Sequence, residues 1–228
     1  MPNNFILIYI DKPIYKISSK QAVDNRGIYL TKTFYSFLFI KSYVELITPI
    51  FCSIYGKSKK AFILDCDNTL WKGIVGEDGV DGISLAESDK NGNYFREVHL
   101  IIKKLLKDGI IIGICSKNNI EDVLEVFDKR EDFILKSTDF TIKKINWNLK
   151  SDNFKEIAKE LNIGIDSVVF MDGSKFEVSL VNDIPPEVET ILVPDKLHDY
   201  PLYFYDKLNL FFKNSVPEED KIRGLLYS

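Results

Sequence analysis

The sequence contains few of the residues from which many enzymes build their reactive sites. Among 228 residues there are two histidines, His99 and His198, and three cysteines, Cys52, Cys66 and Cys115. With so few histidines, a serine–histidine hydrolase is an unfavourable interpretation. The cysteines lie far apart in apolar surroundings, which gives neither a zinc motif nor a disulfide framework and predicts a reducing, cytoplasmic environment.

The chain also lacks a strong excess of charge of either sign. Its formal net charge is −4, and acidic and basic residues are interspersed. A nucleic-acid-binding surface normally shows as a basic excess, so we expect no nucleic-acid partner. Residues 1–5 have no basic region of the kind that opens a signal peptide, which agrees with a cytoplasmic protein.

One strongly apolar and aromatic stretch, residues 34–55, is long enough to raise the question of a membrane span. It contains Lys41 and Glu45, which would form a surface pair on a helix and would each be costly in mid-bilayer. We therefore expect no membrane span but an amphipathic helix that packs on the following domain. With a short apolar strand at residues 5–10, this helix would form an N-terminal appendage over residues 1–57.

Residues 58–228 are expected to form a second, larger domain in which strands and helices alternate. Apolar runs predict strands at residues 61–64, 110–115, 133–135, 168–171 and 190–193. Helical periodicity predicts helices at residues 95–106, 119–127, 154–161 and 175–181. This alternation is typical of an α/β fold with a central parallel sheet flanked by helices. The glycine-rich segment 71–85 predicts turns or a small hairpin, and the aromatic tail, residues 196–228, is expected to pack on the domain.

Polar side chains stand at the ends of three of these predicted strands. The first run ends in Asp65 and Asp67, the second in Ser116 and Lys117, and a later one in Asp172. Ligands of open α/β sheets bind beyond the carboxyl ends of the strands. Buried carboxylates must be neutralised, and Mg²⁺ is usually held by one or two carboxylates plus phosphate oxygens. The pattern therefore indicates a metal, a phosphate and an aspartate nucleophile.

These motifs, in this order, resemble the haloacid dehalogenase superfamily of phosphohydrolases and phosphotransferases. Its pattern is Asp-x-Asp-x-Thr, followed by Ser, Lys and Asp after successive strands. A narrower resemblance, to the FkbH-like subfamily IIIC, is carried by residues 64–71, 76–79, 115–118, 145–147 with Lys150, and 157–164. It extends from about residue 24 to the C-terminus. It implies a Rossmann-like fold without a large cap, with only a small flap hairpin over the site.

The resemblance implies a catalytic role for four of the matched residues. Asp65 would attack phosphorus and form an aspartyl-phosphate, and Asp67 would protonate the leaving oxygen and then activate water. Ser116 would hydrogen-bond the phosphoryl group, although it could instead cap the following helix. Lys150 would stabilise the developing charge. The alternatives for that last role are Lys117, Lys143 and Lys144.

The resemblance also implies a metal site and a substrate site. Asp65, the backbone carbonyl of Asp67 and Asp172 would hold Mg²⁺. The chain departs from the family at Gly173, which replaces a second acidic residue. This predicts weaker metal binding or a transfer of that role to Glu177, which could equally lie on a solvated helix face. Further candidates for substrate binding are Thr69, Lys117 and Asn118.

The function implied is that of an Mg²⁺-dependent phosphatase or phosphotransferase of the FkbH type. FkbH-like proteins are associated with moving a glyceryl unit from a phosphorylated three-carbon donor to an acyl carrier protein, and a step in polyketide or surface-polysaccharide biosynthesis is a related expectation. Cys66 could carry the acyl group, or it could be a packing residue. A site without a large cap favours a bulky or carrier-attached substrate. The alternatives are a general small-molecule phosphatase and a degenerate, non-catalytic binding module.

Overall fold

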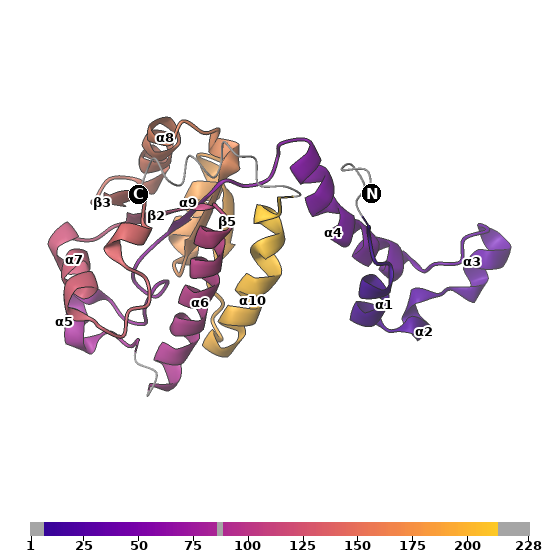
Figure 1. Cartoon of the computed structure of the whole chain (residues 1–228), viewed down its shortest axis with the longest axis horizontal. Coiled ribbons are helices and arrows are strands. Elements are labelled where there is room, and N and C mark those ends of the chain that lie inside the picture. The colour runs from indigo at the N-terminus through magenta and orange to yellow at the C-terminus, as the bar shows by residue number, and fades with distance from the viewer. Residues whose placement is uncertain (1–6, 86–88, 214–228) are drawn as a thin grey trace. The chain divides into compact units, whose positions relative to one another are not determined.

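The structure, a computed structural model, describes residues 7–85 and 89–213 of the chain (Figure 1). It divides the chain into two compact units. The first unit runs to Lys57 and also includes a short segment from Phe212, and the second unit begins at Ser58. Each unit is described separately below.

The second unit is built on a five-stranded parallel sheet with the strand order β3-β2-β1-β4-β5. The strands are β1 (Ala61–Leu64), β2 (Ile111–Ser116), β3 (Ile142–Ile145), β4 (Val168–Asp172) and β5 (Glu189–Leu192). β1 and β4 are buried along their whole length, as expected for strands covered on both faces. Leu64 pairs with Ile114 on one side and Met171 on the other, so the polar residues that follow β1, β2 and β4 reach the same edge.

The third strand is not where the sequence pattern predicted it. Residues 133–135 form no strand, although Phe133 and Leu135 are buried in the core. The strand is β3, whose sequence Ile-Lys-Lys-Ile gives no apolar run. β3 lies at the edge of the sheet, where the Lys143 and Lys144 side chains remain partly exposed, and this explains why an apolar pattern failed to locate it.

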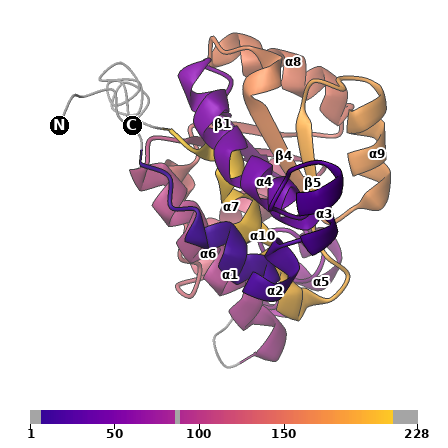
Figure 2. The same cartoon turned by 90° about the vertical axis from the view of Figure 1, so that its right-hand side faces the viewer.

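Helices cover both faces of the sheet, which confirms the predicted α/β architecture (Figures 1 and 2). Side chains alternate along β1, so that Phe62 and Leu64 enter one core and Ala61 and Ile63 enter the other. The helices of the first core are α6 (Lys90–Lys107), α7 (Ile120–Lys129) and α10 (Tyr200–Lys207). Those of the second core are α8 (Lys150–Glu160) and α9 (Lys175–Asp183). Short 3₁₀ turns occupy Ser137–Asp139, Ile165–Ser167, Leu197–Asp199 and Leu208–Phe211.

The glycine-rich segment, residues 71–85, is called the flap here. It contains a short helix, α5 (Val75–Gly82), kinked at Gly79, instead of two hairpin strands. An antiparallel bridge, in which Lys72 and Ser84 exchange two backbone hydrogen bonds, closes its base. Arg130 donates hydrogen bonds to the carbonyls of Val80 and Ile83, which ties the far end of the flap to the body.

The aromatic tail packs on the second unit as far as residue 211. Tyr200, Phe204 and Phe211 are buried, and the ring centroid of Phe204 lies 5.0 Å from that of Phe62 on β1. Residues 214–228, also part of the predicted tail, lie outside the described residues.

The described part of the first unit consists of helices: α1 (Asp11–Ile17), α2 (Ser19–Ala22), α3 (Asn25–Leu30) and α4 (Phe37–Ile54). The expected strand at residues 5–10 is not formed over residues 7–10, and residues 5 and 6 lie outside the described range. α4 is the predicted apolar helix. Glu45 pairs with Lys16 of α1 at 2.9 Å and not with Lys41, because packing of α1 on α4 brings Lys16 closer. Among the described residues, α4 alone has the length and composition of a membrane-spanning helix.

Candidate active site

Three charged side chains meet at the carboxyl ends of β1 and β4; we call them the carboxylate–lysine cluster. Asp65 directly follows β1, Asp172 ends β4 and Lys150 is the first residue of α8. The Lys150 Nζ atom lies 2.8 Å from Asp65 Oδ1 and 2.6 Å from Asp172 Oδ2. All three residues are buried. Because both carboxylates lie within hydrogen-bond distance of one nitrogen, they are close enough to share a single cation.

The cluster has more negative than positive charge, since one ammonium group faces two buried carboxylates. Burial raises the pKa of Asp65 to about 6; Lys150 offsets part of that rise and the charge of Asp172 adds to it. Burial by itself would lower the pKa of Lys150, but the two carboxylates outweigh this effect and raise it. Lys150 is thus a permanent cation, and Asp65 is a carboxylate that an additional positive charge would stabilise.

Asp67 is held in a different way, by neutral donors. Its Oδ1 atom accepts hydrogen bonds from Trp71 Nε1 at 2.9 Å and from the Val75 backbone N–H at 3.0 Å. Its Oδ2 atom accepts one from Asn118 Nδ2 at 2.8 Å. Asp67 is only half-buried and forms no ion pair among the described residues. These three bonds use three of the four lone-pair directions of the carboxylate, which leaves one for a proton.

Gly173 follows from the close packing of two loops. A Cβ atom at this position would lie 2.8 Å from the backbone oxygen of Asn68, so an acidic side chain does not fit there without movement of the backbone. Asn68 itself has a φ of 54°, which places that oxygen toward Gly173. The Gly173 N–H donates to Thr69 Oγ1 at 2.9 Å. Thr69 is fully buried, and its hydroxyl joins the two loops. The predicted contact of Thr69 with substrate stays a prediction.

The segment after β2 supports the two aspartates from behind. Ser116 is buried and is a hydrogen-bond neighbour of Asp65. Asn118 donates to Asp67 and, at 3.3 Å, to Ser116 Oγ, so its amide supports both side chains. The predicted contact of Asn118 with substrate stays a prediction. Lys117 is turned away: its ammonium pairs with Glu177 at 2.7 Å.

Glu177, in the first turn of α9, does not lie on a solvated helix face. Its exposed fraction is 9%, and one carboxylate oxygen pairs with Lys117. The other oxygen, Oε2, is buried and has no hydrogen-bond partner in the described part of the protein. A buried carboxylate oxygen without a partner is unusual, and it keeps Glu177 as a candidate for the role that Gly173 cannot fill.

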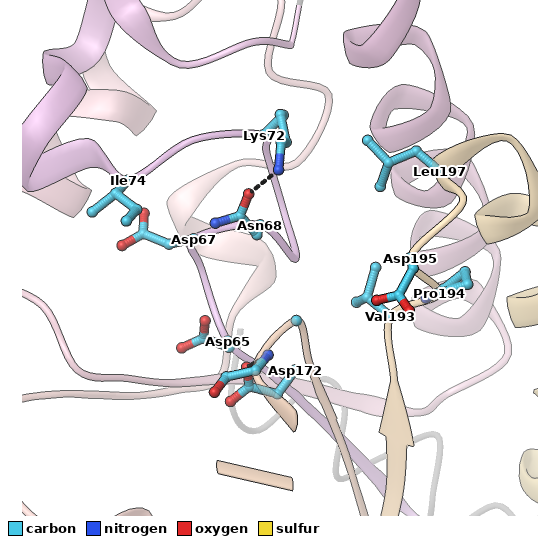
Figure 3. Close-up of a pocket in the computed structure, with 12 residues that line it drawn as sticks. Asp65, Asp67, Asn68, Lys72, Ile74, Asp172, Val193, Pro194, Asp195 and Leu197 are labelled. Carbon is cyan, nitrogen blue, oxygen red and sulfur yellow. Dashed lines mark hydrogen bonds between the residues drawn. The ribbon is translucent and has the colours of Figure 1, made fainter. Parts of the chain in front are cut away.

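A pocket of about 660 Å³ opens over the cluster (Figure 3). Asp65 and Asp172 lie together at one end and Lys72 lies at the other, with Asn68 between them. The remaining lining residues are Asp67, Ile74, Gly173, Ser174, Val193, Pro194, Asp195 and Leu197. Neither Lys117 nor Ser116 lines this pocket. The acidic end is the place where a metal and a phosphate group would meet the predicted nucleophile.

The structure is similar to a crystal structure of the N-terminal part of a Bacteroides fragilis protein, which contains a phosphatase domain and was solved in complex with Mg. The TM-score is 0.82 and the sequence identity 36%, over 93% of this chain and 56% of that chain. The present chain has a haloacid dehalogenase Rossmann-like fold. It spans little more than half the length of this neighbour.

A second solved structure is more distant. It is a haloacid dehalogenase superfamily hydrolase of subfamily IA from Geobacter sulfurreducens, with 14% identity and a TM-score of 0.38, over 59% of this chain and 89% of that chain. That likeness is too low to bear on function. No protein-family model matches the chain, and no curated protein sequence matches it.

Two residues that position the site of this haloacid dehalogenase fold were not identified from the sequence. Trp71 holds Asp67 through its indole N–H; the only available signal was its spacing of four residues from Asp67. Tyr200 donates a hydrogen bond to the backbone oxygen of Thr69 at 3.0 Å, and its oxygen lies 2.9 Å from Met171 Sδ. Tyr200 supports the loop after β1 from the aromatic tail, and no sequence pattern connects two segments so far apart.

The thiol and imidazole groups near the site are buried and neutral. Cys66 is fully buried in the first core, and burial raises the pKa of its thiol well above the usual value. A thiol carrying an acyl group needs an accessible thiolate, so the structure favours the packing role of Cys66. Burial lowers the pKa of His99 to about 4, and its Nε2 atom lies 2.8 Å from the Leu70 oxygen. His99 is therefore a neutral packing residue of the core.

Proposed function

We propose that this chain is an Mg²⁺-dependent phosphatase of the haloacid dehalogenase type that hydrolyses phosphate monoesters. The observation that carries the proposal is the convergence of Asp65 and Asp172 on Lys150 at a pocket, with Asp67 held separately by neutral donors. These are the groups that phosphoryl transfer needs: a nucleophile, a proton donor, and fixed charges that position and stabilise the phosphoryl group.

The side chains of the cluster fit Mg²⁺. Its two carboxylates supply oxygen donors and leave an excess of negative charge over the single ammonium group of Lys150, and burial raises the pKa of Asp65 to about 6. The described residues contain no group of three or more His, Cys, Asp or Glu side chains able to hold a metal. Mg²⁺ does not require one, because it keeps several waters and binds through one or two carboxylates. Asp65 and Asp172, with the Asp67 carbonyl, would hold the ion, which would neutralise charge on the phosphate oxygens.

In the proposed reaction, Asp65 attacks phosphorus, so that a carboxylate O–P bond forms as the ester O–P bond breaks. Asp67 gives a proton to the leaving oxygen through its one remaining lone-pair direction. It then takes a proton from a water molecule, which attacks the aspartyl-phosphate and releases inorganic phosphate. Lys150 stabilises the charge of both steps and holds Asp65 in line.

A phosphotransferase of the FkbH type, delivering a glyceryl unit to an acyl carrier protein, is the second candidate. The observation that favours it is the open pocket, over which the described residues place only the short flap helix and no large cap. The burial of Cys66 argues against that thiol as an acyl carrier. In this version the thiol of the carrier protein would attack the acyl carbon of the phosphorylated donor, so that a thioester C–S bond forms as the acyl C–O bond breaks and phosphate leaves.

The test is hydrolysis of p-nitrophenyl phosphate by the full chain with and without Mg²⁺. Turnover that requires Mg²⁺ and disappears in Asp65→Asn is the expected result. Asp132→Asn is the control, because Asp132 is also an ion-paired aspartate but is half-buried and pairs with Arg130 outside the pocket. If the wild-type chain shows no turnover at high Mg²⁺ concentration, the proposal is wrong and the degenerate binding module is favoured.

A further inference from the structure

Lys72 is a pocket residue for which the proposed reaction has no use. It lies at the end of the pocket away from Asp65 and Asp172 (Figure 3). Its ammonium group donates to Asn68 Oδ1 at 2.8 Å, which is a neutral amide oxygen. Lys72 forms no ion pair with any residue in the described ranges, and its side chain is exposed to solvent in the pocket. Its charge is therefore available to a ligand.

Two other charged side chains, Asp67 and Asp195, line the pocket outside the carboxylate–lysine cluster. Asp195 lines the pocket, and its carboxylate pairs with Lys175 at 2.9 Å. Within the described part of the chain, Lys72 is consequently the one pocket-lining cation, and it has no carboxylate partner. An anion bound near Lys72 would meet an ammonium group that no carboxylate neutralises, in contrast to the acidic end at Asp65.

Apolar side chains line part of the wall between the two ends, alongside Asn68 and Asp195. Ile74 lines one side, and Val193, Pro194 and Leu197 line the side across from it (Figure 3). A ligand that reached from the carboxylate–lysine cluster to Lys72 would pass along these side chains. An aliphatic spacer suits such a wall, because burying apolar surface on both partners is favourable.

We infer that the substrate is a phosphate monoester whose leaving group ends in a second anionic group, a carboxylate or a phosphate, on a short aliphatic spacer, and that Lys72 binds this second group. The inference rests on the proposed function for its phosphate end. Lys72 is a specificity residue in this scheme and takes no part in the chemical steps. Its distance from the cluster selects the length of the spacer.

The effect on affinity is modest because Lys72 is solvated before it binds. Exposed ion pairs contribute little, and a charge-assisted bond in a partly enclosed pocket contributes more. We expect a ligand with the second anion to bind about two- to tenfold more tightly than its uncharged counterpart.

The test measures binding of non-hydrolysable phosphonates by titration calorimetry in the presence of Mg²⁺. Each n-alkylphosphonate is compared with the ω-carboxyalkylphosphonate and the α,ω-bisphosphonate of the same length, over a series of spacers. The proteins are wild type, Lys72→Met, Lys72→Arg and, as a control, Lys155→Met. Lys155 lies on α8 outside the pocket lining, with an exposed partner in Asp152.

The expected result is a preference for the second anion that disappears in Lys72→Met and remains in Lys72→Arg and Lys155→Met. The arm that binds best identifies the second group as carboxylate or phosphate. A wild-type protein without the preference, a preference unchanged in Lys72→Met, or no binding of any phosphonate would each overturn the inference. A Lys72-dependent preference in a chain that hydrolyses no phosphate ester would leave this binding site standing and contradict the proposed hydrolysis.

Discussion

Two aspartates of the loop after β1 are held by opposite means: Asp65 at the buried floor of the pocket, and Asp67 next to the flap. On the floor, Asp65 is buried and bound to a permanent cation, Lys150. Next to the flap, Asp67 is half-buried and is held by the Trp71 indole and the Val75 N–H of the flap and by the Asn118 amide. Two carboxylates of one short loop thus have different electrostatic surroundings. The difference teaches that environment, and not residue type, separates the proposed nucleophile, Asp65, from the proposed proton donor, Asp67.

The largest effect is expected at the floor. Asp65→Asn removes the nucleophile while keeping the shape of the side chain, and turnover should fall by at least about 10⁴-fold. Steady-state rates with p-nitrophenyl phosphate measure this. Substantial activity left in Asp65→Asn would mean that another group attacks phosphorus. The different surroundings of Asp65 and Asp67 would then have no bearing on catalysis.

The next largest loss of rate is expected at Asp67, next to the flap. Asp67→Asn removes the proton donor, and the rate should fall by about 10²–10⁴-fold for alkyl phosphates, whose leaving oxygen needs a proton. p-Nitrophenyl phosphate should lose less, because nitrophenolate leaves without protonation. Equal losses for both substrates would show that Asp67 acts by positioning and not by proton transfer.

A third experiment separates buried from exposed ion pairs. Lys150→Met leaves Asp65 and Asp172 without their cation, and the free energy of unfolding should fall by about 3–5 kcal/mol. In Lys150→Met the carboxylates then take up protons in the folded state, so this loss should be larger at pH 8 than at pH 5.

Lys144→Met is the matched control for Lys150→Met. Lys144 also bridges two carboxylates, those of Glu156 and Glu160, but both of these are exposed. Its loss should cost at most about 1 kcal/mol in urea unfolding. Equal losses of unfolding free energy in the two variants would show that burial does not increase the contribution of Lys150 to stability.

The affinity for Mg²⁺ should depend on pH through Asp65, at the floor of the pocket. In the metal-free protein the pKa of Asp65 is raised to about 6, so the folded state binds a proton there that the unfolded state does not. That stabilisation is present at low pH and is lost as the pH rises through about 6, where Mg²⁺ would replace the proton. The affinity for Mg²⁺ should therefore be roughly tenfold weaker at pH 5 than at pH 7.5. Thermal unfolding with and without Mg²⁺ at both pH values measures this, and a pH-independent Mg²⁺ effect would contradict it.

The smallest effect is expected from a single bond of the flap. Trp71→Phe removes the indole N–H that reaches Asp67 at 2.9 Å, and kcat for alkyl phosphates should fall about fivefold, the equivalent of one hydrogen bond. Trp147→Phe is the control, since its indole donates to Asn119 at an exposed position. A fall in kcat in Trp147→Phe as large as that in Trp71→Phe would contradict the role of the Trp71 indole in holding Asp67.

The sheet was predictable wherever its strands are buried on both faces. β1, β2 and β4 are apolar runs for that reason, and each ends in polar residues that the sequence marks clearly. β3 could not be found, because an edge strand tolerates lysines in its middle. The flap helix was also missed, since glycines that usually indicate turns lie within and beside α5.

The sequence predicted which residues lie at the candidate site, but not what each side chain contacts there. The order of Asp65, Asp67, Ser116, Lys150 and Asp172 along the chain, with strands before three of them, already indicates a shared edge. By contrast, the motifs did not show what Thr69, Lys117 and Asn118 contact. Their side chains bond to the Gly173 N–H, Glu177 and Asp67, respectively. Motif membership says that a residue is near the site, whereas the direction of its side chain depends on packing.

The order of residue types by itself determined the parallel sheet and the edge at which its polar groups gather, because periodicity and strand direction are local properties of the chain. Only the tertiary structure decided that Asp65 shares Lys150 with Asp172. It also decided that Asp67 accepts hydrogen bonds from Trp71 and Asn118. Finally, it brought the Asn68 backbone so close to Gly173 that a Cβ atom would not fit there. The reason is physical. Burial, hydrogen-bond partners and steric room arise from segments far apart in the sequence, and each exists only once those segments have packed together.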